Sequence, residues 1–243
     1  MQKLNVLDHG YVELIETWGT GRAGAPNPST GFQEQDNEVG IVEAARQSTQ
    51  GGFRGWDYDA RLLKYLHDHR HATPFEFAGM VLEVQAPIFV FREWHRHRTQ
   101  SYNEMSARYA PLPDLYYTPT VERVMMDTGK NKQAQGVAPL THDTAGFFVS
   151  RHLKQAYELC EEIYQAALAS GIPKELARAV MPVGHYSRMR ASANLRNWLA
   201  FLTLRMDPNA QWEIRQYAKA VGACVKEQFP RTWELFAERE GHL

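Results

Sequence analysis

The chain has 243 residues, of which 44% are hydrophobic and 12% aromatic, so it can bury a core as one large domain or two small ones. Its formal net charge of −1 excludes a chain-wide positive field that would attract nucleic acid or an anionic membrane. Any anion-binding site must therefore be local.

The sequence carries no sign of membrane insertion or secretion. No apolar run reaches the roughly 18 residues that a transmembrane helix needs, and residues 1–8 lack the apolar segment and cleavage site of a signal peptide. We expect a cytoplasmic protein with no membrane contact. Cys160 and Cys224, the only cysteines, lie among apolar residues in helical patterns, which favours packed side chains over a disulfide or a nucleophile.

The N-terminal segments predict a strand, a loop and a helix. Residues 4–18 alternate between apolar and polar side chains, as in a strand. The loop-rich segment 19–31 has four glycines and two prolines. Residues 41–48 predict a helix that ends near 49–52, where two glycines follow Gln50.

A second helix is predicted over residues 58–69, with Asp57 as its N-cap. The histidines at its end, in the segment 67–71, would suit zinc on a strand. A helix end separates side chains at this spacing, and its dipole favours histidines without a metal, so we predict no metal site.

Residues 75–91 are rich in Phe, Val and Ile and predict a long buried strand that leads into a polar cluster. If the strand continues, its period of two puts Arg96 and Arg98 on one face and His97 on the other. Neighbouring guanidiniums repel unless an anion lies between them, and their forked donors suit phosphates or carbonyl-rich rings.

The alternative interpretation of this cluster is a solvated charged surface. If the segment were helical, Glu104 and Arg108 would form a local ion pair at i, i+4.

The second half of the chain is predicted to be mainly helical. Loop-rich residues 110–136 precede these elements: a long amphipathic helix over 141–170, a short helix over 174–181, a strand over 188–194, a helix over 194–205 and a last helix over 209–229. We therefore predict an α+β fold, with one domain over residues 1–243 and a twisted, mostly antiparallel sheet flanked by long helices. The helices are concentrated in the C-terminal half.

The polar cluster resembles the signature of flavin-dependent thymidylate synthases, which is Arg-His-Arg, seven residues, then Ser. Arg96-His97-Arg98 and Ser106 have this spacing, and eight of the thirteen residues from 96 to 108 match family positions, which include Ser101, Asn103, Glu104 and Arg108. So many matches rarely coincide by chance. Weaker resemblance extends from about Ile41 to Lys226, in Ala44-Ala45-Arg46 with Ser48, His71-Ala72-Thr73-Pro74-Phe75-Glu76, Ala177-Arg178, Met181-Pro182, Asn194-Leu195-Arg196, Leu204-Arg205 and Gln211-Trp212-Glu213-Ile214.

The resemblance implies a reaction and its reactants. FAD would be the cofactor, methylenetetrahydrofolate the carbon donor and NADPH the reductant in the conversion of dUMP to dTMP, without a protein nucleophile. It also implies a homotetramer whose active sites combine residues of several subunits. No Gly-x-Gly-x-x-Gly loop occurs, so NADPH would bind transiently near the flavin rather than in a Rossmann unit.

The resemblance also implies which residues form the site. Arg108 and Arg178 would hold the nucleotide phosphate, and Arg205, the catalytic residue, would stabilise an ionised uracil ring. The implied flavin contacts are Ser48, Thr73, Arg96, His97, Arg98, Glu104, Asn194 and Arg196. The implied substrate contacts are Glu93, Arg96, Glu104, Ser106, Arg108, Arg178 and Arg205.

Four positions depart from the family pattern. Glu93 stands where Gln is common, Ala200 where Asn is frequent, Asn209 where His is frequent, and Phe77 where many relatives have His. An acid near a nucleotide would repel the phosphate. We therefore expect Glu93 to face the base or to pair with a neighbouring arginine.

Three alternatives stay open. The first is a sister enzyme that hydroxymethylates the nucleotide or alters another pyrimidine, which the mass of the product would reveal. The second is an RNA-binding module in which the cluster stacks on bases, although the near-neutral charge argues against it. The third is an inactive structural oligomer, against which the complete signature argues.

Overall fold

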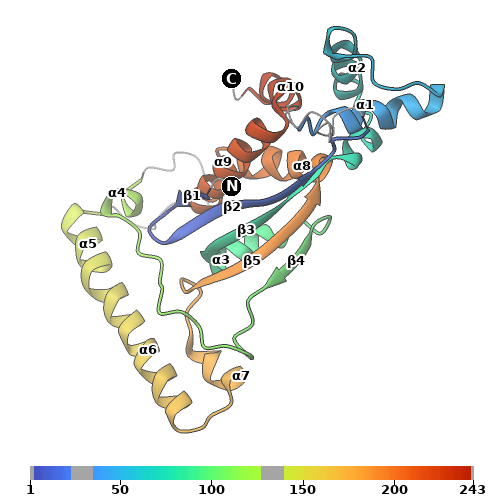
Figure 1. Cartoon of the computed structure of the whole chain (residues 1–243). Coiled ribbons are helices and arrows are strands. Elements are labelled where there is room, and N and C mark those ends of the chain that lie inside the picture. The colour runs from blue at the N-terminus through green and yellow to red at the C-terminus, as the bar shows by residue number, and fades with distance from the viewer. Residues whose placement is uncertain (1–2, 23–34, 127–139, 242–243) are drawn as a thin grey trace.

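The computed structural model describes residues 3–22, 35–126 and 140–241 (Figure 1). Its centre is a five-stranded antiparallel sheet in the order β1 (Lys3–Val6), β2 (Gly10–Trp18), β3 (Gly79–Pro87), β5 (Tyr186–Asn194) and β4 (Ser101–Glu104). The α+β class and the mostly antiparallel sheet are confirmed. No described helix has the length and apolar character to cross a membrane.

Helices and short helical turns make up most of the remainder, more of them in the C-terminal half. They are α1 (Val39–Arg46), η1 (Gln47–Thr49), α2 (Trp56–Asp68), η2 (Thr73–Phe77), α3 (Ile88–Trp94), α4 (Val121–Val124), α5 (His142–Phe147), the π-helical η3 (Phe148–Leu153), α6 (Lys154–Ala169), α7 (Lys174–Ala177), η4 (Arg178–Val180), α8 (Leu195–Arg205), α9 (Trp212–Gln228) and α10 (Pro230–Glu240).

One face of the sheet forms the core with α3, α8 and α9. The strand period of two decides which side chains face these helices. On β3, Met80, Leu82 and Val84 are fully buried, whereas the residues between them are only half-buried. Trp94 and Trp198 fill the space between sheet and helices.

The predicted strand over residues 4–18 is a hairpin. Its turn places Leu7 at φ 59°, and Gly10 begins the second strand. A Cβ at Gly10 would lie 1.9 Å from the hydroxyl oxygen of Tyr217 on α9. Glycine is required here because the helix packs directly on the backbone. Of the predicted loop 19–31, residues 23–31 lie outside the described residues.

The strand predicted over residues 75–91 is wrong at both ends. β3 covers only Gly79–Pro87, and the apolar run that follows belongs to α3. Pro87 has φ −59° and ψ 145° at the N-cap, where it ends the strand and precedes the first helical residue. Periodicity alone cannot separate a short apolar strand from a short buried helix.

The prediction of Asp57 as the N-cap of the second helix is wrong. The helix begins at Trp56 after Gly55, which has φ 96°, a conformation that glycine adopts readily. Asp57 lies in the first turn, where its carboxylate is favoured by the helix dipole.

The predicted last helix and the predicted loop 110–136 each need a correction. The helix expected over 209–229 is α9, and it is not the last, because a further helix, α10, begins at Pro230. Proline tolerates the first helical position since its missing N–H would have no partner there. The predicted loop 110–136 contains the short helix α4, and its residues 127–136 lie outside the described residues.

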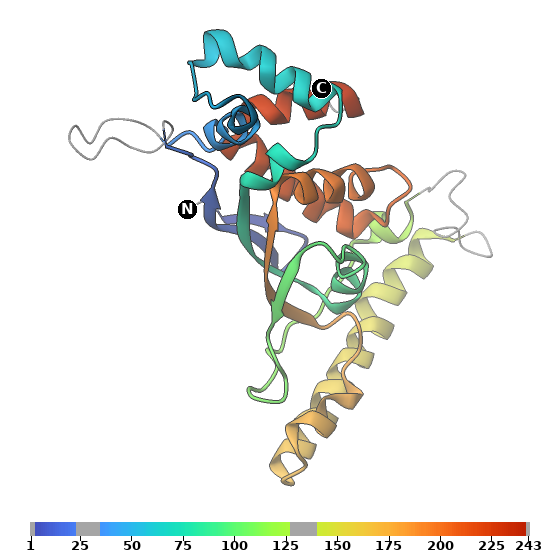
Figure 2. The same cartoon turned by 90° about the vertical axis from the view of Figure 1, so that its right-hand side faces the viewer.

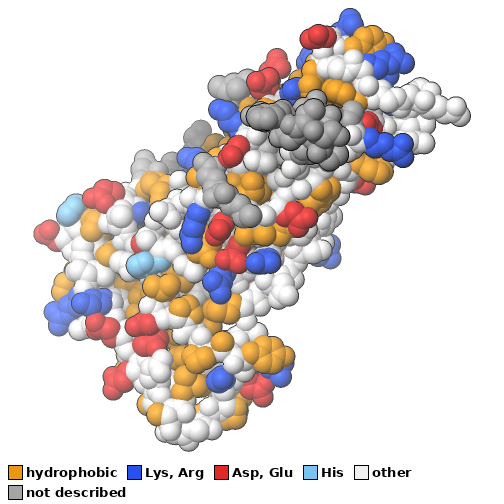
Figure 3. All heavy atoms as spheres, viewed as in Figure 1, with side chains coloured by type: hydrophobic (Ala, Val, Ile, Leu, Met, Phe, Trp, Pro, Cys, Tyr) orange, Lys and Arg blue, Asp and Glu red, His pale blue; other side chains and the backbone are white. Residues whose placement is uncertain are grey.

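The long helix predicted over 141–170 is confirmed as the continuous run α5, η3 and α6. With α7 it forms a limb that projects from the sheet (Figures 1 and 2). Much of the limb's apolar surface is exposed, and apolar side chains gather over its lower part in Figure 3. Leu159 is 56% exposed and Leu176 is 62% exposed.

The carboxylate of Asp59 joins α1 to α2 and is fully buried. It accepts hydrogen bonds from the Arg46 guanidinium and, at 2.6 Å, from the backbone N–H of Arg54. We expect Asp59→Ala to lower the free energy of unfolding by about 3 kcal/mol, because it leaves a buried arginine unpaired. Urea unfolding measures this, with exposed Asp57→Ala as the matched control. Equal losses in the two variants would contradict it.

Candidate active site

The signature arginines lie in a turn after α3, not on the predicted strand. The predicted strand faces therefore do not exist, although Arg96 and Arg98 are exposed while His97 is half-buried. Tyr102 fixes the turn by donating its hydroxyl to the carbonyl oxygen of His97 at 2.7 Å. No ion pair to Arg96 or Arg98 occurs within the described ranges, so both guanidiniums are available to an anion.

Arg205, at the end of α8, binds two residues of this region. Its Nη1 donates to Glu93 Oε2 at 2.9 Å, its Nη2 donates to the Glu93 carbonyl oxygen at 2.6 Å, and its Nε donates to His97 Nε2 at 2.9 Å. We call Glu93, His97 and Arg205 the Arg205 clamp. The expectation that Glu93 pairs with an arginine is confirmed.

Burial lowers the pKa of His97 to about 4, and the neighbouring Arg205 charge acts in the same direction, against an opposing effect of Glu93. The imidazole is therefore neutral at physiological pH. Because its Nε2 accepts a hydrogen bond from Arg205, its proton lies on Nδ1.

His97 makes the stability of the protein depend on pH. Its pKa of about 4 in the folded protein is below the value of about 6.5 for an unfolded chain, so the unfolded state binds more protons between these values. The contribution of neutral His97 is complete above this window and is lost as pH falls through it. We expect thermal unfolding of wild type to lose more stability than that of His97→Gln as pH falls from about 6.5 to 4. Parallel losses would contradict this assignment.

Two of the predicted phosphate ligands meet at α7. Arg108 Nε donates to Glu175 Oε2 at 3.0 Å, and Arg178 Nε approaches the Glu175 carbonyl oxygen at 3.4 Å. Lys174 Nζ donates to the Tyr109 carbonyl oxygen at 3.0 Å. We call Arg108, Lys174 and Arg178 the cationic corner.

In sequence, Glu104 and Ser106 lie between His97 of the clamp and Arg108 of the cationic corner. The hypothetical helical pair between Glu104 and Arg108 is wrong, because Glu104 ends strand β4 and its Oε1 accepts from the Ser187 hydroxyl at 2.6 Å. The Ser106 hydroxyl oxygen accepts from the Arg108 backbone N–H at 3.3 Å.

The predicted flavin contacts outside the signature gather at the other end of the sheet. Arg196 pairs with Glu76 of η2, which begins at Thr73 and packs against α1 and α8. Asn194 caps α8, since its Oδ1 accepts from the backbone N–H at position 197 at 3.0 Å. Ser48 lies in η1 and donates to the Ala45 carbonyl oxygen at 3.1 Å.

Beside Arg196 lies a cavity of about 400 Å³ between α8, α2 and α10. Its wall is mostly apolar, with Ala200 and Leu204 from α8 and Phe75 from η2, and its charged lining residues are Arg70, Arg196, Arg239 and Glu240. Such a site suits a flat, largely apolar ring that also carries anionic groups.

Comparisons with known proteins identify the family of this chain. The family model described as "Thymidylate synthase complementing protein" matches residues 32–231. A flavin-dependent thymidylate synthase of Thermus thermophilus is 39% identical over 96% of this chain and 77% of its own length. That of Thermotoga neapolitana is 35% identical over 96% of this chain and 94% of its own. This chain belongs to the flavin-dependent thymidylate synthase family.

This chain is also similar to a solved structure, the UMP/dUMP methylase PolB from Streptomyces cacaoi bound with 5-Br dUMP. It superposes with a TM-score of 0.79 at 32% identity, over 97% of both chains. A second PolB structure, with 5-Br UMP, gives a TM-score of 0.77 at 33% identity, over 97% of this chain and 96% of PolB.

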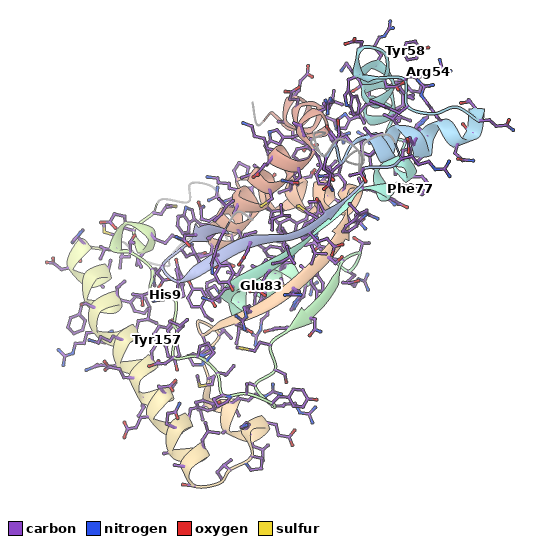
Figure 4. All side chains as sticks on the ribbon, viewed as in Figure 1. His9, Arg54, Tyr58, Phe77, Glu83 and Tyr157 are labelled. Atoms are coloured by element: carbon purple, nitrogen blue, oxygen red, sulfur yellow. The ribbon has the colours of Figure 1, made fainter. Side chains whose placement is uncertain are left out.

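Within one chain, the predicted site residues form two groups that lie beyond opposite ends of β5. The cationic corner lies beyond the Tyr186 end of β5, and Arg196 lies beyond its Asn194 end. The strand has nine residues, so these ends are about 26 Å apart. In Figure 4, Phe77 lies toward the Asn194 end of the strand and Tyr157 toward its Tyr186 end.

Sequence reasoning missed several residues beside the predicted ones. Glu175 and Lys174 stand next to the predicted phosphate ligands, and Arg239 lines the cavity. The only sequence signal was the charge of residues 174 and 175 close to Arg178. Arg239 could not be found, because α10 itself was not predicted.

No metal site emerges from the described part of the chain, which contains no group of three or more His, Cys, Asp or Glu able to hold an ion. The segment 67–71 shows why. His69 Nδ1 lies 2.9 Å from the Tyr65 carbonyl oxygen, and His67 is buried against Phe75. Both cysteines are free, and burial raises the pKa of Cys224 to about 11, so its thiol is not activated.

Proposed function

We propose that the protein catalyses the FAD-dependent reductive methylation of dUMP to dTMP, with methylenetetrahydrofolate as carbon donor and NADPH as reductant. The observation that carries the proposal is the Arg205 clamp, which joins Arg205 of α8 to Glu93 and to His97, the central residue of the Arg96-His97-Arg98 part of the signature. The family and the PolB structures support a pyrimidine nucleotide as the substrate.

The nucleotide phosphate would bind at the cationic corner, together with Ser106. Three cations there exceed the single carboxylate of Glu175, so the site attracts a dianion. Arg96 and Glu104 would contact the sugar and the base from the signature segment. Arg205 and Glu93 would lie at the pyrimidine ring, with Arg205 as the catalytic residue.

The residues beside the cavity fit a flavin. The apolar wall suits the ring system, and Arg196 and Arg239 of the cavity lining, together with the exposed Arg96 and Arg98 of the turn after α3, suit the diphosphate. Ser48, Thr73 and Asn194 would supply short polar contacts, and neutral His97 would contact the flavin without adding charge. When bound, reduced flavin supplies the hydride equivalents for the new methyl group.

In this proposal the protein binds and polarises the pyrimidine ring, and it does not supply a nucleophile that attacks the ring. Methylation at carbon 5 often depends on a cysteine thiolate that adds to carbon 6. Cys224 is buried with a raised pKa, and Cys160 is a half-buried residue of α6. Arg205 instead places positive charge beside a ring carbonyl oxygen, where negative charge accumulates as carbon 5 becomes electron-rich.

We also propose that the enzyme is a cytoplasmic homotetramer with shared active sites. The separation of the predicted site residues along β5 supports this proposal, because no described contact links the cationic corner to the flavin end within one chain. The exposed apolar surface of the limb supports it too, since association would bury it.

The test is to purify the protein, record its visible spectrum, add dUMP, methylenetetrahydrofolate and NADPH, and weigh the product. A yellow protein that yields product at the mass of dTMP supports the proposal. A product at the mass of hydroxymethyl-dUMP would instead assign the sister hydroxymethylase. A colourless protein that takes up neither flavin nor dUMP would overturn it, and RNA binding would be tested next.

A second candidate reaction is methylation of the ribonucleotide UMP. The observation that favours it is the TM-score of 0.79 to a protein named UMP/dUMP methylase. Parallel assays with UMP and dUMP at equal concentration separate the two, because a UMP/dUMP methylase turns over both nucleotides and a dUMP methylase turns over dUMP alone.

A further inference from the structure

An arginine-rich aromatic surface lies at the start of α2, outside the cavity and the Arg205 clamp. The guanidinium carbon of Arg54 lies 5.2 Å from the centre of the Tyr58 ring, and that of Arg61 lies 5.6 Å from it. Figure 4 shows Arg54 and Tyr58 together at this end of the molecule. Both arginines are exposed, and Tyr58 is 48% exposed. We call Arg54, Tyr58 and Arg61 the α2 patch.

The α2 patch carries more positive charge than its neighbours balance. Arg46 also approaches the tyrosine ring, at 5.4 Å, but the buried carboxylate of Asp59 neutralises it. Within the described ranges, no ion pair reaches Arg54 or Arg61. Asp57, an exposed acid in the first turn of α2, offsets one of their two charges. Because cations held around one ring repel each other, an anion that lies between them is favoured.

The surface around the patch is open to a ligand. A Cβ placed on Gly52 or Gly55 would meet no atom within 4 Å. Nucleic-acid bases stack on exposed tyrosine rings, and guanidiniums bind phosphates through paired N–H donors. Since both exposed arginines lie within 6 Å of the ring centre, the phosphate must be close to the stacked base. A ribose 2′-phosphate has this position, whereas the diphosphate of a nucleotide lies farther from its base.

An exposed face of α2 connects the patch to the cavity beside Arg196. Tyr65, which is 50% exposed, follows Tyr58 by seven residues and so lies on the same face of the helix, about 10 Å farther along its axis. The ring centre of Tyr65 lies 5.6 Å from that of His71, and His71 lines the cavity. A dinucleotide in an extended conformation can cover this distance, with one end on the patch and the other at the cavity.

We propose that the α2 patch binds the 2′-phosphoadenosine half of NADPH, with Tyr58 against the adenine and with Arg54 and Arg61 on the 2′-phosphate. The proposal rests on the proposed function, because it takes NADPH as the reductant and the cavity as the flavin site. The nicotinamide half would extend along α2 toward the cavity. In dinucleotide-binding folds, an arginine beside the ribose accommodates the 2′-phosphate of NADP. The patch gives this protein the same preference without a Rossmann unit.

Two fragments of the dinucleotide test the binding directly. 2′,5′-ADP carries the 2′-phosphate and 5′-AMP lacks it, and calorimetric titration of the purified protein measures both affinities. For wild type we expect 2′,5′-ADP to bind about tenfold more tightly, a moderate gain for charge-assisted hydrogen bonds at an exposed site. For the double variant Arg54→Ala with Arg61→Ala we expect a difference of less than about threefold.

Tyr58→Ala separates the base from the phosphate. Because stacking on the adenine is common to the two fragments, we expect this variant to weaken both by about fivefold and to leave their ratio unchanged. Arg151→Ala is the matched control, since it removes an exposed arginine whose guanidinium carbon lies 5.2 Å from the centre of the Phe147 ring on the limb. It should bind both fragments as wild type does.

Flavin reduction gives a second readout, followed by the loss of the visible absorbance of the flavin. We expect NADPH to reduce wild type about tenfold more efficiently than NADH, and the double variant to accept the two almost equally. Equal affinity of wild type for the two fragments would overturn the proposal, and so would a double variant that keeps the wild-type ratios. The proposed function stands in both cases, because the flavin is still reduced. If NADPH reduces the flavin of neither wild type nor variant, the proposed function itself fails, and this proposal with it.

Discussion

Arg205→Ala is expected to lower kcat for dTMP formation about 10²- to 10³-fold, the usual cost of losing one preorganised donor at a site of developing charge. The effect is large because Arg205 is only 15% exposed, so water replaces its charge poorly. The loss also leaves Glu93 and His97 without their shared partner. Single-turnover assays with prereduced enzyme would separate this step from nucleotide binding.

The matched variant for this prediction is Arg205→Lys, which keeps the charge. A lysine ammonium cannot donate to Glu93, to the Glu93 carbonyl oxygen and to His97 in the planar arrangement of a guanidinium. We expect it to recover only part of the rate. If Arg205→Ala turned over at the wild-type rate and only bound dUMP more weakly, Arg205 would be a binding residue and not a catalytic one.

The elements with a clear pattern were predictable from the sequence. The helix α8 begins after Asn194, whose side chain caps it, and β5 matches the predicted strand over most of its length. The apolar run after Pro87 was not decidable, because its residues satisfy both a buried strand and a buried helix. Only the packing of α3 against α9 distinguishes the two.

The sequence named residues for the candidate site, but it could not give the contacts between them. The signature and the resemblance named Arg108, Arg178 and Arg205, and the charge argument gave Glu93 an arginine as partner. The sequence could not say which arginine, because the two partners are 112 residues apart. Nor could it find the Arg108–Glu175 pair across 67 residues, since such contacts depend on how β4 and α7 are placed by the sheet.

The division of site residues along β5 leads to a second large effect. If each active site combines the cationic corner of one subunit with the Arg205 of another, Arg108→Ala and Arg205→Ala each remove one half of every site. We expect both variants alone to be almost inactive. Each still carries the residue that the other lacks.

Mixing the two inactive variants, after mild dissociation and reassembly, is therefore expected to restore activity. With random assembly of a symmetric oligomer, about one site in four would receive both wild-type residues, so roughly a quarter of wild-type activity should return. The double variant Leu159→Glu with Ile163→Glu on the limb is a second test of the same assembly. The two side chains are 56% and 45% exposed in the single chain. If subunits associate through this apolar surface, the added charges would be buried between them and would prevent association. Activity that stays near zero in mixtures with proven subunit exchange would mean that Arg108 and Arg205 of the same chain serve one site.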